Sequence, residues 1–176
     1  MKKFLIAAAV LALIAALLFV PLPFESTTAI VSSVFIARRN EDVFNYVTTP
    51  GNWPKWHPSS LAVSGSTDHS LMLEETVTEN YKVAGHYGTA VWTVVERTAP
   101  SRWTITAEVE GRNAGLVRYN LSPENGGTRF TREFIYHPHS LLTIALDRLS
   151  IRPQIEAEST QAVQQLKKIL ETQGPL

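Results

Sequence analysis

Hydrophobic residues form one uninterrupted run near the start of the chain, from Phe4 to Val20, with Lys2 and Lys3 before it and Pro21 after it. The run has 17 residues. The apolar region of a signal peptide has about 7 to 15 residues, and a membrane-spanning helix has about 17 to 25, so the length is close to both. No small-residue cleavage site follows the run directly, so we expect an uncleaved transmembrane helix rather than a signal peptide. Residues 1–24 would then form a membrane anchor and tether, and residues 25–176 a separate folded domain.

The two lysines predict the orientation of this anchor. Positive side chains favour the cytoplasmic side of a membrane, and here they lie on the short N-terminal flank of the apolar run. We therefore expect a single-pass protein of the inner or cytoplasmic membrane, inserted through residues 4–20. Its folded domain would lie on the periplasmic or outer side.

After the anchor, the pattern is first that of a strand and then that of a helix. Residues 28–37 are rich in Ile, Val and Phe, which predicts a strand. Asn40 then precedes helically spaced apolar residues up to Val47, which predicts a short helix with a capping residue. The proline- and tryptophan-rich segment 52–58 predicts a packed turn.

The segment from Leu61 to His137 predicts six strands, because short apolar alternations are separated by turn signals such as Asn125-Gly126-Gly127. One of these strands is expected over residues 71–83. Beyond His139 the apolar residues recur at helical spacing as far as Ile169. The expected fold class is therefore α+β, with a curved antiparallel sheet of about seven strands wrapped on a long C-terminal helix.

Composition narrows the classes of function. The chain has 16 basic and 16 acidic side chains, and removing Lys2 and Lys3 leaves residues 25–176 with 14 − 16 = −2 formal charges. A nucleic-acid binder held by phosphate contacts is not expected from this balance. The sequence has no cysteine, which excludes disulfides, thiolate metal ligands and a thiol nucleophile.

Four segments of the sequence resemble the helix-grip fold of the START-related polyketide cyclase and dehydrase superfamily, SRPBCC. The segments are residues 34–37 leading into 42–47, the turn Asn52-Trp53-Pro54-Lys55-Trp56, Gly127-Thr128-Arg129, and the C-terminal helix around residues 162–170. The resemblance covers about residues 25–172 and extends to membrane-tethered members of the family. It implies a hydrophobic cavity between helix and sheet for lipids, polyketides, hormones or other apolar molecules. This fold hosts enzymes, carriers and partner-binding modules alike.

Strand alternation places charged side chains on apolar faces. Glu75, Glu79 and Tyr81 share the apolar phase of their predicted strand, and Arg132 shares that of Phe134. In one interpretation these groups form a polar end of the cavity, with a glutamate paired to Arg132. In the other, a bulge or an open sheet rim lets them reach water.

Aromatic residues are candidates for the cavity wall. Trp103 and Tyr119 lie on apolar strand faces, and Trp56 could close the cavity mouth, although aromatic residues in a packed turn often belong to the core. The predicted ligand-binding residues are Trp56, Glu75, Glu79, Tyr81, Trp103, Tyr119, Arg132 and Phe134.

No metal or cofactor site is expected. His137 and His139 would share a strand face, but Pro138 interrupts the strand and no third ligand stands at a recognised spacing. The sequence also contains no phosphate-binding glycine loop and no hydrolase motif.

Residues 141–149 form an apolar patch that is wider than a simple core stripe. The patch is either a lid over the cavity or a surface that touches the bilayer, or else it is simply buried at one end of the sheet.

The sequence favours a membrane-tethered domain that binds an apolar small molecule or lipid. A metal-independent enzyme of the cyclase or dehydratase kind is the alternative, with Glu79 or His86 as general base. A third interpretation is an interaction module with a filled core and no ligand. The sequence identifies no protein partner.

Overall fold

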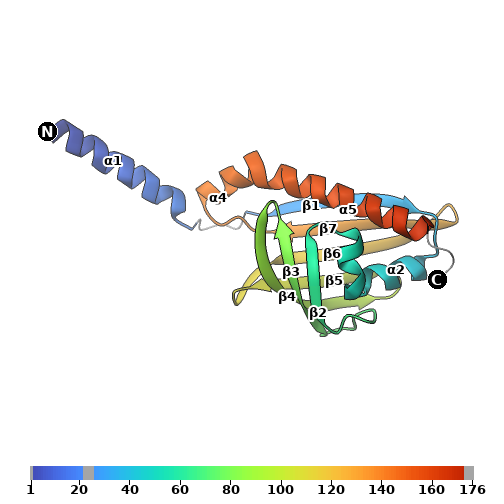
Figure 1. Cartoon of the computed structure of the whole chain (residues 1–176). Helices are drawn as coiled ribbons and strands as arrows, with labels where there is room; N and C mark the ends of the chain where they lie inside the picture. Colours follow the sequence, from blue (N-terminus) through green and yellow to red (C-terminus); the bar gives the residue numbers. More distant parts are fainter. Residues whose placement is uncertain (1, 22–25, 173–176) are drawn as a thin grey trace.

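The structure is a computed structural model that describes residues 2–21 and 26–172. Its first element is helix α1 (Lys2–Phe19). Strand β1 (Thr28–Ile36) follows, and then α2 (Asn40–Thr48), the 3-10 turn η1 (Pro50–Asn52) and the short helix α3 (Trp53–Trp56). The first part of the chain thus has the predicted order of N-terminal helix, strand and short helices (Figure 1).

Six further strands complete the sheet. They are β2 (Ser60–Gly65), β3 (Thr76–Val83), β4 (His86–Thr98), β5 (Arg102–Val109), β6 (Arg112–Glu124) and β7 (Gly127–Tyr136). All neighbours are antiparallel, in the order β1-β7-β6-β5-β4-β3-β2. The expected seven-stranded curved antiparallel sheet is confirmed.

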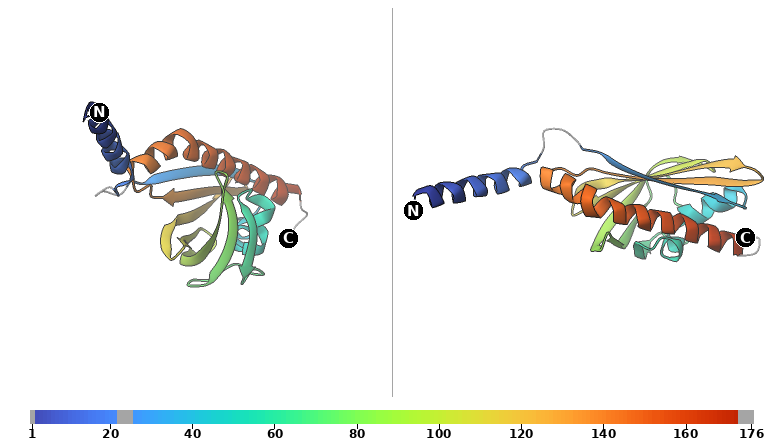
Figure 2. Two further views of the ribbon diagram at one scale, coloured as in Figure 1. Left: turned by 60° about the vertical axis from the view of Figure 1, so that its left-hand side comes forward. Right: turned by 90° about the horizontal axis from the view of Figure 1, so that it is seen from above.

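The described part of the chain ends in a long interrupted helix. Helix α4 (Leu141–Leu146) leads through a π-helical turn, η2 (Asp147–Ile151), into α5 (Arg152–Thr172). Helix α5 lies across the concave side of the sheet and runs beside β1 (Figure 2). Its inward residues recur every three or four positions, as a helix that covers a sheet requires. They are Ile155, Ser159, Ala162, Val163, Leu166 and Leu170.

The core beneath α5 is divided into two parts. The larger cluster packs α2, α3 and the C-terminal half of α5 against the sheet, and includes Phe44, Trp56 and Leu166. A smaller cluster of Ile30, Ala84 and Ile155 lies under the N-terminal half of α5. The space between helix and sheet is therefore filled at one end and only partly filled at the other.

A glycine bends strand β6 at the less filled end. Gly115 has φ +128°, a left-handed conformation that residues with a side chain rarely adopt, and a Cβ at this position would collide with the carbonyl oxygen of Ile135. The register between β5 and β6 shifts at the same level, next to Ala107. This β-bulge increases the local twist of the sheet.

The predicted strand over residues 71–83 is wrong in its first part, because β3 begins only at Thr76. Leu71 is buried, but Met72 and Leu73 are more than half exposed. Leu71 is held from outside the loop, because its N–H donates to the carbonyl of Thr48 at the end of α2, at 3.1 Å. The alternation that suggested a strand was therefore a loop contact followed by exposed residues.

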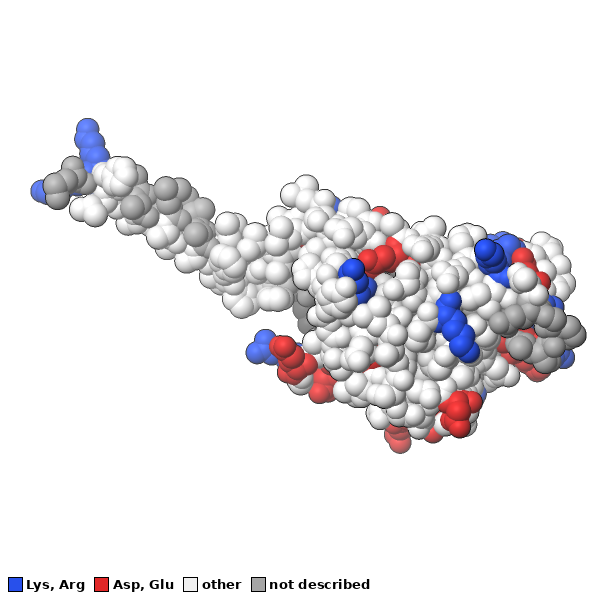
Figure 3. Space-filling view, viewed as in Figure 1, with Lys and Arg blue, Asp and Glu red and all other residues white. Residues whose placement is uncertain are grey.

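Helix α1 projects away from the domain and contacts it near α4 (Figures 1 and 2). On the face that Figure 3 shows, the charged side chains of the described residues of α1 lie at its free end. Among residues 2–21 and 26–172, no helix combines the length and the hydropathy needed to cross a membrane. The transmembrane helix expected for residues 4–20 stays a prediction.

The apolar patch of residues 141–149 is exposed. Leu141 and Leu146 are nearly half exposed, and Leu149 is 82% exposed. The interpretation that this segment is buried at one end of the sheet is wrong. Leu141, Leu146 and Leu149 instead face solvent at the end of the domain where Pro21 pairs with Ser140, while Thr143 of α4 faces the cavity between helix and sheet.

Candidate functional site

A cavity of about 390 Å³ lies between α5 and the concave face of the sheet. This volume is in the range of pockets that hold small organic molecules. Its walls are mainly apolar and come from β4, β5, β6 and α5, with Ala90, Ile105, Ala107, Val117 and Ile155 among them. The cavity extends to Asn113 and Thr143, near the β5–β6 turn and α4.

Arg132 on β7 provides a buried positive charge in this cavity. The residue is 7% exposed, and its Nη1 donates to the hydroxyl of Ser159 on α5 at 3.1 Å. Its Nε is buried and finds no acceptor among the described residues. Burial lowers the pKa of Arg132, while Tyr119, its register partner on β6, and Glu79 act in the opposite direction.

Glu79 on β3 is the buried carboxylate of the same region, at 8% exposure. Its Oε2 accepts a hydrogen bond from Trp92 Nε1 at 2.7 Å. Burial raises the pKa of Glu79, and this shift is partly opposed by the hydroxyl of Ser60, the hydrogen bond from Trp92 and the charge of Arg132. Within the described part of the chain no ion pair joins Glu79 to Arg132. Glu79 and Arg132 therefore do not form the predicted ion pair, although the charge of each still affects the pKa of the other.

His57 adds a hydrogen-bond donor to this end of the cavity. Burial and the charge of Arg132 lower the pKa of His57 well below its usual value, so the ring is neutral at pH 7. Its Nδ1 accepts from the backbone N–H of Ser59 at 3.2 Å. In a neutral imidazole the proton must then be on Nε2. This N–H is buried and has no partner among the described residues.

The predicted site residues divide into two groups. Six of them line the cavity: Trp56, Glu79, Tyr81, Tyr119, Arg132 and Phe134. Glu75 and Trp103 lie elsewhere. The ligand-binding roles of all eight stay predictions, but the last two lack the position that the prediction required.

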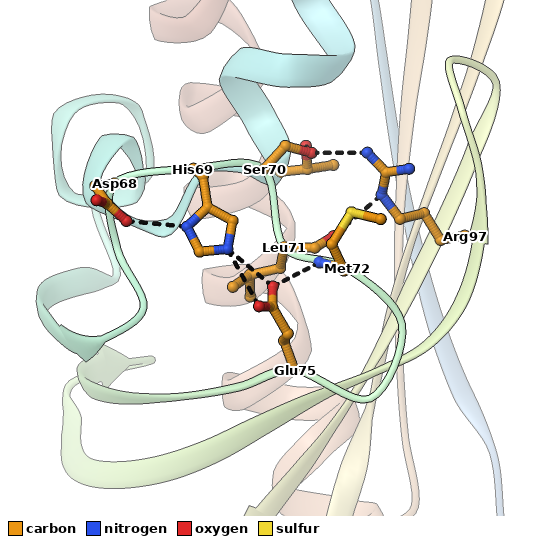
Figure 4. Close-up of polar contacts among 8 residues, drawn as sticks. Asp68, His69, Ser70, Leu71, Met72, Glu75 and Arg97 are labelled. Atoms are coloured by element: carbon orange, nitrogen blue, oxygen red, sulfur yellow. Dashed lines mark hydrogen bonds and ion pairs between the residues drawn. The ribbon is translucent and has the colours of Figure 1, made fainter.

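Glu75 is part of an exposed loop outside the cavity (Figure 4). Its Oε2 accepts from the backbone N–H of Met72 at 2.7 Å and lies 3.0 Å from His69 Nε2, whose other ring nitrogen lies 2.9 Å from Asp68. The hydrogen bond from Met72, followed by that from His69, lowers the pKa of Glu75. The two carboxylates raise the pKa of His69. Glu75 therefore orders a loop and does not contact the cavity.

Trp103 lies behind the cavity wall. It is fully buried, stacks on Tyr119 with ring centroids 5.2 Å apart, and meets the edge of Trp53 at 6.2 Å. Tyr119 separates it from the cavity, and burial raises the pKa of this tyrosine to about 12. The expectation that Trp103 lines the space under the C-terminal helix is corrected by this packing.

His86, the other candidate general base, is not a cavity residue. Its Nδ1 lies 3.0 Å from the carbonyl oxygen of Ala84 in the β3–β4 turn. The described residues also contain no group of three side chains placed to hold a metal ion.

Several cavity residues were not recognised as binding candidates in the sequence. Ser60 and Trp92 carry no specific sequence signal, because a hydroxyl in a strand and a tryptophan on a strand face are common. His57 belongs to no motif that assigns it a binding role. The signal that could have drawn attention to it is its position directly after the specific Trp-Pro-x-Trp turn.

Two further carboxylates, those of Asp147 and Glu158, also line the cavity. Asp147 in η2 accepts hydrogen bonds from Tyr136 and, at 2.9 Å, from Thr28. Glu158 on α5 accepts from Ser59 at 2.7 Å and from the backbone N–H of Ala84 at 3.1 Å. These carboxylates hold β1, β7 and the loop after α3 against the C-terminal helix.

The fold and this cavity define a helix-grip protein with a mainly apolar, ligand-sized interior and a buried polar end. The chain belongs to the family described as "Polyketide cyclase / dehydrase and lipid transport", which matches residues 27–171. This confirms the family resemblance inferred from the sequence.

Solved structures of bacterial proteins have the same fold. Protein Ms6760 from Mycobacterium smegmatis is 17% identical, with a TM-score of 0.59 over 86% of this chain and 99% of its own. Protein MLL2253 from Mesorhizobium loti is 14% identical, with a TM-score of 0.62 over 84% and 100%. A conserved protein from Geobacillus kaustophilus is 12% identical, with a TM-score of 0.64 over 82% and 96%. At these identities the likeness concerns the fold alone. No functionally curated protein matches this chain.

Proposed function

We propose that this chain binds a hydrophobic small molecule or lipid in the cavity between its sheet and its C-terminal helix. The observation that carries the proposal is the cavity itself, which combines apolar walls with a polar end built from Arg132, Glu79 and His57. Apolar walls supply affinity by removing ligand surface from water, and a few polar groups fix its orientation. Membership of a family of cyclases, dehydrases and lipid transporters supports a ligand of this class.

The direct test is mass spectrometry of organic extracts from the full-length protein, purified in mild detergent. We expect a copurifying apolar molecule, or, if none survives purification, saturable uptake of a hydrophobic fluorescent probe. A protein that carries no such molecule and takes up no probe would instead be the interaction module without a ligand.

An enzyme of the cyclase or dehydratase kind is the second candidate, and Glu79 is the observation that favours it. A buried carboxyl group with a raised pKa in a cavity is a typical general base. Glu79→Gln keeps the shape of the side chain but cannot take up a proton. For a carrier we expect this variant to retain the copurified molecule within about tenfold of wild type, about 1.4 kcal/mol. A base would contribute about 10²- to 10⁴-fold to turnover. Product formed by wild type and not by Glu79→Gln would identify an enzyme.

We propose further that residues 4–20 anchor the domain to the inner or cytoplasmic membrane, with residues 25–176 on the outer or periplasmic side. The support is the uncharged run after Lys2 and Lys3, and the exposure of Phe4, Leu5 and Leu13 on α1. The apolar surface of α4 and the nearby end of the cavity lie on the same side of the domain as α1, where a lipid leaving a bilayer would arrive.

Intact-mass measurement of the mature protein from its native host tests the anchor. We expect the full-length mass, recovered from the membrane fraction. Loss of about 20 to 30 N-terminal residues would identify a cleaved signal peptide and contradict the anchor.

A further inference from the structure

The carboxylates that line the cavity have hydrogen-bond donors within the protein, whereas the arginine that lines it has no carboxylate partner among the described residues. Each carboxylate has at least one hydrogen-bond donor from the protein: Trp92 for Glu79, Thr28 and Tyr136 for Asp147, Ser59 and the Ala84 N–H for Glu158. Arg132 is the lysine or arginine among the described lining residues, and no ion pair of the described residues includes it. The guanidinium interacts instead with neutral hydroxyl groups, that of Ser159 at 3.1 Å and that of Tyr119.

Three buried polar atoms of the cavity residues have no hydrogen-bond partner within the described protein. They are Arg132 Nε, His57 Nε2 and Trp56 Nε1. Each carries a hydrogen to donate and cannot accept one, because the hydrogen bond from Ser59 fixes the tautomer of His57. Buried N–H groups of this kind normally have a partner.

These groups lie at one end of the cavity. The rings of Trp56 and His57 meet at 5.4 Å, and Trp56 also contacts Tyr119 at 6.2 Å. Tyr119 is the register partner of Arg132, and the guanidinium is near enough to His57 to affect its titration. The polar end therefore presents several donors and one positive charge to whatever fills the cavity.

We infer that the cavity occupant carries a carboxylate, which accepts hydrogen bonds from Arg132 and His57 while its apolar part lies against the walls formed by β5 and α5. This inference rests on the proposed function, which it narrows to amphipathic carboxylic acids. A carboxylate compensates the buried charge of Arg132 and gives the N–H groups an acceptor. A phosphomonoester fits less well, because its charge of about −1.5 to −2 would place excess negative charge near Glu79.

The test compares decanoate with 1-decanol and methyl decanoate, which share the apolar chain and differ in the head group. Full-length protein in nanodiscs is loaded with a neutral hydrophobic probe, and each compound displaces it, with empty nanodiscs as the blank. At pH 7.5 we expect decanoate to bind at least about tenfold more tightly than the alcohol or the ester, as charge-assisted hydrogen bonds in a buried site require. For Arg132→Met we expect the three compounds to bind alike, with the affinity for decanol within about threefold of wild type.

Arg118→Met is the matched control. Arg118 belongs to β6, pairs with Glu133 at 2.8 Å, and is not a cavity residue. The Arg118→Met variant should therefore keep the wild-type preference for decanoate over decanol and methyl decanoate. If Arg132→Met does not fold, His57→Phe keeps an aromatic ring and removes one donor, and it should weaken decanoate more than decanol.

The outcomes separate this inference from the proposed function. Equal binding of decanoate and decanol by wild type, or a preference that survives Arg132→Met and His57→Phe, would overturn the carboxylate and leave the hydrophobic cavity as a binding site. Failure of wild type to bind any of the three compounds or the probe would overturn both.

Discussion

Ala107→Phe is expected to abolish ligand uptake while leaving the domain folded. Ala107 is buried on β5 between Trp92 of β4 and Gly115 of β6, and its side chain faces the cavity. A phenyl ring at this position would occupy the space that the apolar part of a ligand needs. We expect the affinity for a hydrophobic probe to fall at least about a hundredfold, about 2.8 kcal/mol.

The same substitution should cost little stability, because the ring enters open space rather than a close-packed core. Overpacking of a filled core costs about 1 to 3 kcal/mol, and here we expect less than about 1 kcal/mol or a gain. Ala29→Phe on the exposed side of β1 is the control, and it should change neither binding nor folding. Wild-type affinity in folded Ala107→Phe would mean that the ligand binds elsewhere.

Trp103→Ala is expected to destabilise the domain strongly. The indole is fully buried between Tyr119 and Trp53, so its removal leaves a large hole in the main cluster of the core. Large-to-small substitution of a buried tryptophan lowers the free energy of unfolding by about 3 to 5 kcal/mol. Urea denaturation of the full-length protein in mild detergent, followed by circular dichroism, measures this difference.

Trp103→Phe distinguishes a core residue from a ligand contact. We expect this variant to bind the hydrophobic probe as wild type does and to keep most of the change in tryptophan emission, since Trp56 and Trp92 line the cavity. Loss of that emission change in a folded Trp103→Phe protein, or a loss of less than about 1.5 kcal/mol in Trp103→Ala, would contradict the position assigned to Trp103.

The strands and their faces were predictable from the sequence where the strands are long and paired on both sides. Glu79 and Arg132 face the cavity because β3 and β7 have the predicted alternation, and Tyr81, Tyr119 and Phe134 follow from the same rule. The family resemblance added the C-terminal helix on the concave face. These two sources together give the fold and most of the cavity wall.

Alternation does not show how far along a strand the cavity extends, and this is why Trp103 was misplaced. Its side chain is on the predicted face of β5, but at the end of the strand where the core is filled by Trp53 and Tyr119. Glu75 was misplaced for a different reason. The loop before β3 happens to alternate, and the burial of Leu71 depends on contacts with Thr48 and Arg97, which are distant in sequence.

The donor end of the cavity could not be predicted because it depends on long-range contacts. Ser159 reaches Arg132 across 27 positions of the sequence, and Trp92 reaches Glu79 across 13. The tautomer of His57 depends on the backbone at Ser59, in a turn whose conformation has no simple sequence pattern. Local periodicity contains none of this information.

The backbone at Gly115 determines the local curvature of the sheet, whereas the side chains of other residues determine the chemistry of the cavity wall. The bend at this position is a property of the backbone, since a side chain would collide with Ile135. Ala107 and Val117 are among the neighbouring residues that line the cavity wall. During evolution such wall positions can exchange without altering the curvature that encloses them, so related chains that retain this glycine can diverge in ligand preference while keeping the same scaffold.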